Sequence, residues 1–307
     1  MNIIARAIGW FRRISALPVK IYKIQEALGR IEQRQIAQSS CGISNSEFRV
    51  FSQWGEDGLI QYLVHNVEID RKIFIEFGVE NYTEANTRFL LSNNSWSGLI
   101  LDGDKDNIEF VKKDPIYWAC NLKAECSFIT KDNINELITR SGIAGDIGLL
   151  SVDIDGNDYW VWEAINCVSP RIVVCEYNSL FGPIAKVTTP YAPDFVRGSA
   201  HFSKVYYGAS ISALSELAGK KGYSLVASNT AGNNLFFVRN DVIGSLKVLS
   251  PRDAYRKASF REYHNENGNL MFYDLETTLE KIKLLEVYDF NVKAVRKIKD
   301  VAGIIQL

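Results

Sequence analysis

The sequence contains little histidine and cysteine, and neither residue type forms a known motif. Only 3 histidines and 5 cysteines occur among 307 residues, and no two cysteines stand in a CxxC pair. An odd number of scattered cysteines argues against a disulfide framework and against a zinc site, so we expect free thiols in a reducing compartment. The phosphate-binding loop, the nucleophile elbow and the G-x-G-x-x-G run are also absent.

Long apolar runs and a strong excess of one charge are missing as well. No apolar run reaches the roughly 18 residues that a membrane-spanning helix needs, and the formal net charge is -1, so no nucleic-acid partner is expected. Arg6, Arg12 and Arg13 interrupt the first apolar stretch without a small-residue cleavage site after it, which argues against a secretory signal. We therefore expect a cytoplasmic protein, with the inner face of the membrane as a second location.

The chain divides into three regions. Residues 1–45 form an amphipathic helical segment, residues 46–242 form the main domain, and residues 243–307 form a charged helical cap or tail. In the first region, apolar and basic residues alternate at nearly helical spacing, and after Pro18 the spacing of Ile21 and Ile24 from later apolar residues resembles a coiled-coil seam. Three partners remain open for residues 1–40: the chain's own domain, a second copy in a homo-oligomer, or an anionic membrane surface.

The main domain alternates short apolar runs with helical patterns. Strands are predicted at 72–79, 97–102, within 117–130, at 148–153 and at 171–176, and helices at 83–92, 107–113, 134–140, 160–165 and 211–220. Such alternation indicates βαβ units and a parallel sheet. Two further strands, 223–227 and 235–239, surround a turn-rich loop, so the sheet should end in an antiparallel hairpin. The prediction is a doubly wound α/β fold with a seven-stranded, Rossmann-like sheet.

Acidic residues end four of the five predicted parallel strands, at Glu76, Asp102, Asp153 and Glu176. Ligands of doubly wound sheets bind beyond these strand ends. Clustered carboxylates repel one another, so a ligand, a cation or hydrogen-bond donors should compensate them; the alternative is that each acid caps the following helix. Asp102 is placed to accept both hydroxyls of a ribose, and Gly78 permits a tight turn beside a ligand.

Two further residues are candidates for chemistry. Asp155 lies two residues after Asp153, and with Glu176 the two aspartates offer the oxygen ligands that Mg²⁺ or another divalent cation prefers. His201 lies in a proline-rich insertion at 179–207 that would cover a substrate. It is a candidate general base, with a plain surface histidine as the alternative.

Several stretches resemble a bacterial branch of the FkbM-type methyltransferases, a family often found with glycan biosynthesis. The resemblance covers about 50–260 and is carried by FSQWGEDG at 51–58, FIEFGV at 74–79 with Asn86 and Thr87, WSGLILDGD at 96–104, SVDIDGNDYW at 151–160 and YGAS at 207–210. It implies a class I methyltransferase fold and O-methylation of a sugar or glycan acceptor with S-adenosylmethionine. The residues implied in cofactor binding are Gln53, Asp57, Glu76, Gly78, Asn86, Thr87, Asp102 and Asp104. Asp153 and Asp155, with His201 as the alternative, are implied in catalysis.

A second resemblance concerns the metal. DGNDY at 155–159 and VCEY at 174–177 are similar to segments of the metal-dependent macrolide-sugar O-methyltransferases, which hold magnesium on acids at the fourth and fifth strand ends. This similarity implies Asp153, Asp155 and Glu176 as metal ligands, although Cys175 stands where a second acid of that pair would be. Two rival functions remain: a nicotinamide-dependent oxidoreductase, and a non-catalytic scaffold with a methyltransferase fold.

Overall fold

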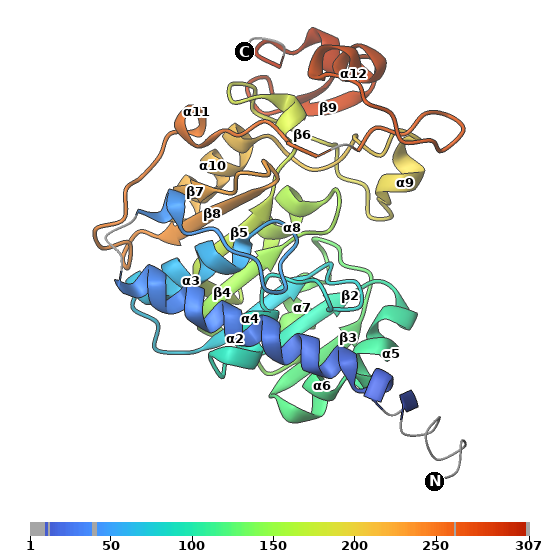
Figure 1. Ribbon diagram of the computed structural model, residues 1–307. Helices are drawn as coiled ribbons and strands as arrows, with labels where there is room; N and C mark the ends of the chain where they lie inside the picture. Colours follow the sequence, from blue (N-terminus) through green and yellow to red (C-terminus); the bar gives the residue numbers. More distant parts are fainter. Residues whose placement is uncertain (1–9, 12, 39–41, 261, 305–307) are drawn as a thin grey trace.

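A seven-stranded sheet forms the centre of the molecule in the computed structural model, which describes residues 10–11, 13–38, 42–260 and 262–304 (Figure 1). The strands, in spatial order, are β3 (Leu122–Cys126), β2 (Ser97–Asp102), β1 (Ile73–Phe77), β4 (Gly145–Val152), β5 (Val168–Glu176), β8 (Asn234–Arg239) and β7 (Tyr223–Ser228). The five strands β1 to β5 run parallel, and β8 lies antiparallel to both β5 and β7. The predicted doubly wound sheet with a terminal antiparallel hairpin is confirmed.

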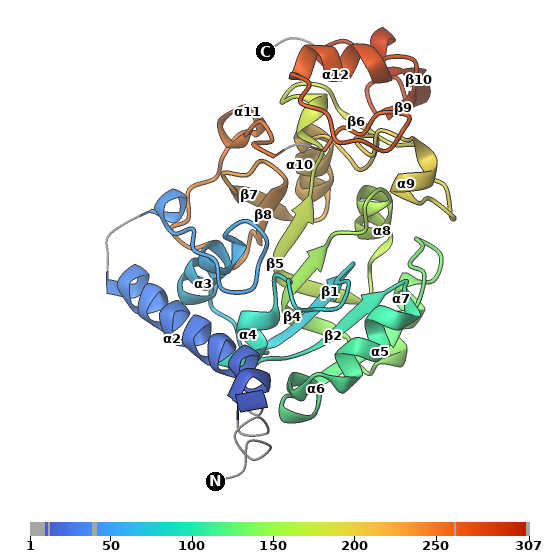
Figure 2. The same cartoon turned by 45° about the vertical axis from the view of Figure 1, so that its right-hand side comes forward.

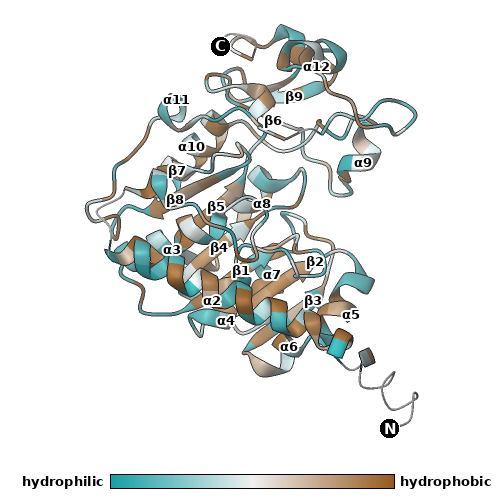
Figure 3. Ribbon diagram, in the orientation of Figure 1, coloured by the Kyte–Doolittle hydropathy of each residue, from teal (hydrophilic) through white to brown (hydrophobic). Residues whose placement is uncertain are grey.

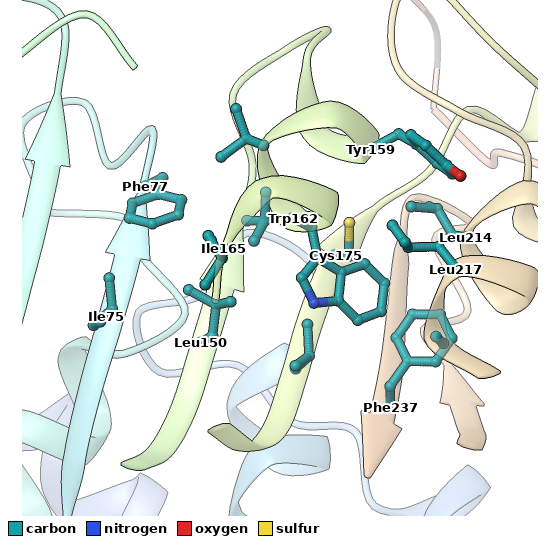
Figure 4. Close-up of a cluster of buried hydrophobic side chains, with 14 of the residues drawn as sticks. Ile75, Phe77, Leu150, Tyr159, Trp162, Ile165, Cys175, Leu214, Leu217 and Phe237 are labelled. Atoms are coloured by element: carbon teal, nitrogen blue, oxygen red, sulfur yellow. The ribbon is translucent and has the colours of Figure 1, made fainter. Parts of the chain in front are cut away.

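Helices cover both faces of this sheet, and each face has its own hydrophobic core. The helices of the main domain are α3 (Glu56–Asn66), α4 (Arg88–Asn93), α5 (Lys105–Lys113), α6 (Pro115–Ala119), α7 (Ile134–Arg140), α8 (Asp158–Ala164) and α10 (Ile211–Lys220). Successive residues of a strand point to opposite faces, so Ile75 packs in one core and Phe74 in the other. In the first core, Trp162 lies beside Cys175 and 5.1 Å from Phe237, ring to ring (Figure 4). Much of the main sheet is brown in Figure 3, because its inner strands are buried on both sides and consist mostly of apolar residues.

Three helix starts differ from the prediction, and one of them is that of α8, which begins at Asp158 and not at residue 160. The helix expected over 83–92 begins only at Arg88, because the preceding loop is held in an irregular form by the carboxylate of Glu76. The helix expected over 107–113 begins at Lys105, because the Asp104 side chain accepts a hydrogen bond from the Asp106 amide and so caps it.

The helix α2 (Leu17–Gln38) lies along the outside of the main domain, against α3 and α4 (Figures 1 and 2). Gly29 is its buried residue, and an added Cβ there would lie 2.5 Å from Val50 and 2.8 Å from Phe89. Gln33 accepts a hydrogen bond from Asn93. Residues 1–9 of the predicted N-terminal segment lie outside the described residues. Within the described ranges, no helix is both long enough and apolar enough to cross a membrane.

The C-terminal region contains a sheet as well as helices, unlike the predicted helical cap or tail. The strands β9 (Glu286–Asp289) and β10 (Ala294–Lys297) pair antiparallel, and β9 also pairs with β6 (Val187–Thr188) from the insertion. The region also holds α11 (Pro251–Ala254), α12 (Leu275–Ile282) and the 3-10 helix η3 (Ile298–Asp300), and the remaining short helices of the chain are η1 (Ile43–Asn45), η2 (Ser179–Phe181) and α9 (Arg197–Ala200). Strands of two to four residues are too short to show a period-two pattern in the sequence.

Candidate functional site

A cavity of about 740 Å³ lies at the carboxyl ends of β1, β2, β4 and β5. The sequence-predicted residues that line it are Gln53, Glu76, Gly78, Asn86, Asp102, Asp153, Asp155 and Glu176. Phe195, Arg197, Phe260 and Glu262 line it from the insertion and the C-terminal region. The cavity therefore sits where the strand order reverses between β1 and β4, the usual ligand position in this type of sheet.

Glu76 uses its carboxylate to shape the loop between β1 and α4. Its oxygens accept hydrogen bonds from the backbone amides of Asn86 (2.8 Å) and Thr87 (3.0 Å). Burial raises the pKa of Glu76 to about 7, against the effect of these donors. Gly78, two residues on, has φ +68, and an added Cβ would lie 1.7 Å from the carbonyl oxygen of Asp153. Glycine is thus required where β1 and β4 approach each other below the cavity.

Asp102 presents a fixed carboxylate at the end of β2. Its two oxygens accept hydrogen bonds from the backbone amides of Glu80 (2.7 Å) and Asp104 (2.8 Å). A carboxylate oxygen has further acceptor capacity, and Asp102 lines the cavity. Phe128, a residue that is 47% exposed, lines the same cavity and offers an apolar face there. The Asp104 side chain caps α5 instead and lines only a second, adjoining cavity.

Three carboxylates gather between the ends of β4 and β5. Asp153, Asp155 and Glu176 each offer an oxygen within 4.8 Å of the other two. Burial, with the neighbouring carboxylates as the next cause, raises the pKa of both Asp153 and Glu176 well above the ordinary value. The Oε2 atom of Glu176 is buried and has no hydrogen-bond partner among the described residues. A buried acceptor without a donor is costly, so this cluster suits a cation or a hydroxyl donor.

Arg197 and Glu262 complete the cluster, although neither was predicted from the sequence. The Arg197 guanidinium lies 2.6 Å from Asp155 and 2.8 Å from Glu262, and 3.8 Å from the centre of the Tyr207 ring. The positive charge of Arg197 thus compensates part of the negative charge of the three clustered carboxylates and of Glu262. Arg197 lies in the insertion and Glu262 in the C-terminal region, where neither spacing nor a strand end marks them in the sequence.

Asp57 acts at a distance from the cavity. Its Oδ2 atom accepts hydrogen bonds from the backbone amides of Val50, Phe51 and Ser52, each at 2.7 Å. The turn that these bonds fix leads directly to Gln53, which lines the cavity. Asp57 does not itself line the cavity in the described structure, and neither does Thr87, whose side chain bonds to Glu76.

Replacing Asp57 with alanine should lower the free energy of unfolding by at least about 2 kcal/mol, because three buried backbone amides lose the carboxylate oxygen that accepts from all of them. Urea denaturation of the two proteins measures this difference. Asp57→Asn keeps one acceptor oxygen of similar shape and should lose less. Equal stability of the alanine variant and the parent would contradict the role given to Asp57.

A second carboxylate, Glu56, ties this same turn to the β7–β8 hairpin. It accepts hydrogen bonds from the Trp54 amide (2.8 Å) and from the side-chain amides of Asn229 (2.7 Å) and Asn234 (2.9 Å). Asn234 lines the cavity. These two asparagines also escaped the sequence analysis, because a turn-rich hairpin loop carries asparagine for conformational reasons alone.

His201 is not brought to the acidic cluster. Its Nδ1 atom lies 2.6 Å from the Ser203 hydroxyl, and burial lowers its pKa. In the described structure His201 lines neither of the two adjoining cavities. The cavity therefore presents carboxylates, and not this histidine, to a ligand.

The arrangement of the sheet decides the fold type. The order β3-β2-β1-β4-β5-β8-β7, with β8 antiparallel between two parallel strands, is that of a methyltransferase sheet. The fold is that of a class I S-adenosylmethionine-dependent methyltransferase. No family model matches the chain, and no curated protein matches it.

Solved structures of methyltransferases are similar to this chain. The N-terminal domain of EvdMO1 with SAH bound has a TM-score of 0.40 and 11% identity, over 68% of this chain and 94% of that one. A putative caffeoyl-CoA O-methyltransferase from Staphylococcus aureus has a TM-score of 0.40 and 12% identity, over 70% and 98%. A putative O-methyltransferase from Klebsiella pneumoniae has a TM-score of 0.39 and 11% identity, over 70% and 90%.

Proposed function

We propose that this protein is a cytoplasmic methyltransferase of the FkbM type that transfers a methyl group from S-adenosylmethionine to a sugar hydroxyl of a glycan or glycan precursor. The observation that carries the proposal is Asp102, a carboxylate fixed at the end of β2 on the wall of a large cavity in a methyltransferase sheet. The sequence resemblance to FkbM-type enzymes supports the sugar acceptor.

The lining of the cavity fits a nucleoside cofactor. Asp102 would accept hydrogen bonds from the two ribose hydroxyls, and Phe128 would offer an apolar face to the adenine. Gln53 and Asn86 also line the cavity, and we propose that they hold the amino-acid end. When bound, S-adenosylmethionine supplies a methyl group attached to a positively charged sulfur. A hydroxyl oxygen can bond to this methyl group while the sulfur leaves.

The acids would prepare the acceptor. A sugar hydroxyl must be aligned with the methyl group, and alignment of this kind contributes about 7–11 kcal/mol. It must also lose its proton, and Asp153 or Asp155 is the base we propose for the protein without a metal ion. Burial raises the pKa of Asp153, so its carboxylate is a stronger proton acceptor than an exposed aspartate. Arg197 holds Asp155 in place through their ion pair.

A divalent cation is a further part of the proposal. Asp153, Asp155 and Glu176 would hold Mg²⁺, since their oxygens lie close together and the Glu176 Oε2 atom lacks a donor among the described residues. When bound, the ion supplies Lewis acidity that lowers the pKa of a hydroxyl. The ion pair of Asp155 with Arg197 competes for one of these three ligands.

Calorimetric titration of S-adenosylhomocysteine into the purified protein, with and without magnesium, tests this function. We expect roughly micromolar affinity and tighter binding when magnesium is present. A matched titration with NAD separates the nicotinamide-dependent oxidoreductase, which the antiparallel β8 does not favour. If neither cofactor binds, the protein is a non-catalytic scaffold and the proposal is wrong. If S-adenosylhomocysteine binds with the same affinity with and without magnesium, the divalent cation is no longer part of the proposal.

A further inference from the structure

We infer that α2 and the described residues just before it, 10–11 and 13–16, rest on an anionic membrane surface through one exposed apolar stripe. The stripe consists of Trp10, Ile14, Leu17, Ile21, Ile24, Leu28 and Ile31, and each of these side chains is exposed. Ile24, at 59%, is the most exposed of the five stripe residues within α2. The inference does not depend on the proposed methyltransferase activity.

The stripe is separate from the face that holds α2 to the domain. The inward face contains Tyr22, Gly29 and Gln33, at helical spacings of seven and four. The Tyr22 ring lies 6.1 Å from that of Phe51, and Gln33 bonds to Asn93. Docking on the domain therefore uses a different set of residues and leaves the stripe uncovered in the described structure. Figure 3 shows brown segments alternating with teal ones along α2.

The charge beside the stripe favours an anionic partner. Five basic residues and two acidic ones occur among the described residues 10–38, although the whole chain has a net charge of -1. The described residues before Glu26 include Arg13, Lys20 and Lys23 and no acid, and all three basic side chains are exposed. At 100° per residue within α2, Lys20 lies at the edge of the stripe, where its stem can follow an apolar surface while its charge reaches headgroups.

A second copy of α2 fits this surface less well. The stripe repeats every three and four residues, as a coiled-coil seam does. Whether two copies of α2 pair, and in which orientation, would therefore depend on the charged residues that flank the stripe. In a parallel pair, Lys20 would face Gln25 and Ala27 would face Glu32, so no oppositely charged pair would form. In an antiparallel pair the basic edge would face its own copy. Anionic headgroups instead complement the whole edge, at about 1 kcal/mol for each basic residue near the surface, or about fivefold in affinity.

The aromatic residues agree with a helix that lies in the membrane interface. Trp10 and Phe11 are 64% and 73% exposed and stand next to each other before α2. Aromatic side chains concentrate at the boundary between headgroups and acyl chains, and an amphipathic helix with a basic edge lies in that plane with its apolar face inward.

Co-sedimentation of the full chain with lipid vesicles tests the inference. We expect binding to vesicles of phosphatidylcholine with phosphatidylglycerol, little binding to phosphatidylcholine alone, and weaker binding as salt rises. Lys20→Gln with Lys23→Gln should weaken binding about thirtyfold. Ile21→Gln, Ile24→Gln and Leu28→Gln together should abolish it, since glutamine preserves the helix. Leu284→Gln, at an equally exposed position (58%) in the C-terminal region, is the matched control and should bind like the parent.

Three kinds of result would overturn the inference. One is failure of the parent protein to bind anionic vesicles. Another is equal binding to neutral and anionic vesicles, or an unchanged affinity in the lysine variant. The third is a dimer in sedimentation equilibrium that the triple glutamine variant dissociates, without vesicle binding by the parent, which would make a second copy the partner. Circular dichroism of each variant establishes that it is folded.

Discussion

Asp102→Ala should weaken the binding of S-adenosylhomocysteine by at least about a hundredfold. The carboxylate is the acceptor that we assign to two ribose hydroxyls, and hydrogen bonds to a charged group contribute about 1.5–3 kcal/mol each. The same carboxylate also accepts from the amides of Glu80 and Asp104, so the alanine variant loses some order in the loop as well. Calorimetric titration gives the affinity, and thermal unfolding shows whether the variant is folded.

Asp104→Ala is the matched control for this experiment. It removes a carboxylate two residues away that caps α5 and lines only the adjoining cavity. Loss of this cap should cost about 1 kcal/mol of stability and leave the affinity for S-adenosylhomocysteine nearly unchanged. If both variants bind S-adenosylhomocysteine equally weakly, the loss of affinity results from a change in α5, and Asp102 is not the ribose acceptor.

Asp153→Asn should lower kcat for methyl transfer to a glycan acceptor by about 10²–10⁴-fold, the usual contribution of a positioned base. The amide has nearly the shape of the carboxylate but neither accepts a proton nor carries charge. Because Asp153 lies among the acids and is not one of the residues assigned to the nucleoside, the affinity for S-adenosylhomocysteine measured without magnesium should change little. Transfer of a labelled methyl group under saturating cofactor measures the rate.

His201→Asn separates the two candidate bases. The imidazole bonds to Ser203 and lines neither of the adjoining cavities, so its loss should leave kcat within about threefold of the parent, far from the 10²–10⁴-fold of a lost base. A large fall in kcat for the His201 variant together with normal activity of the Asp153 variant would reverse the assignment.

The sheet was predictable because its inner strands carry a strong local signal. Strands buried on both faces are unbroken apolar runs, and β1, β2, β4 and β5 are of this kind. The strand β3 was only confined to 117–130, because this edge strand is exposed at Lys123 and Cys126 and its apolar run is interrupted. The three-stranded sheet escaped prediction because β6 has two residues and its partner β9 lies far along the chain.

The site was predictable where the chemistry stands at a strand end. Asp102, Asp153 and Glu176 were found in this way, and the cavity does collect them. The sequence could not show which carboxylates are occupied by backbone amides, as that of Asp57 is, because such bonds depend on the path of a loop. It also could not place Arg197, since the position of an insertion over a sheet follows from tertiary packing.

The pairing of β6 with β9 sets the order in which parts of the chain can fold during synthesis. Thr188 leaves the ribosome long before Tyr288, its partner across the sheet, whereas each parallel strand of the main sheet has a neighbour close in the chain. The parallel part of the main sheet, β1 to β5, can therefore assemble while the chain is still growing. The insertion that contains Arg197 packs against the C-terminal region, so it can reach its final position only when the last strands emerge. Before then, a nascent or truncated chain would expose the apolar residues Phe181 and Val187, which are buried in the folded protein. Such a chain would be a substrate for chaperones.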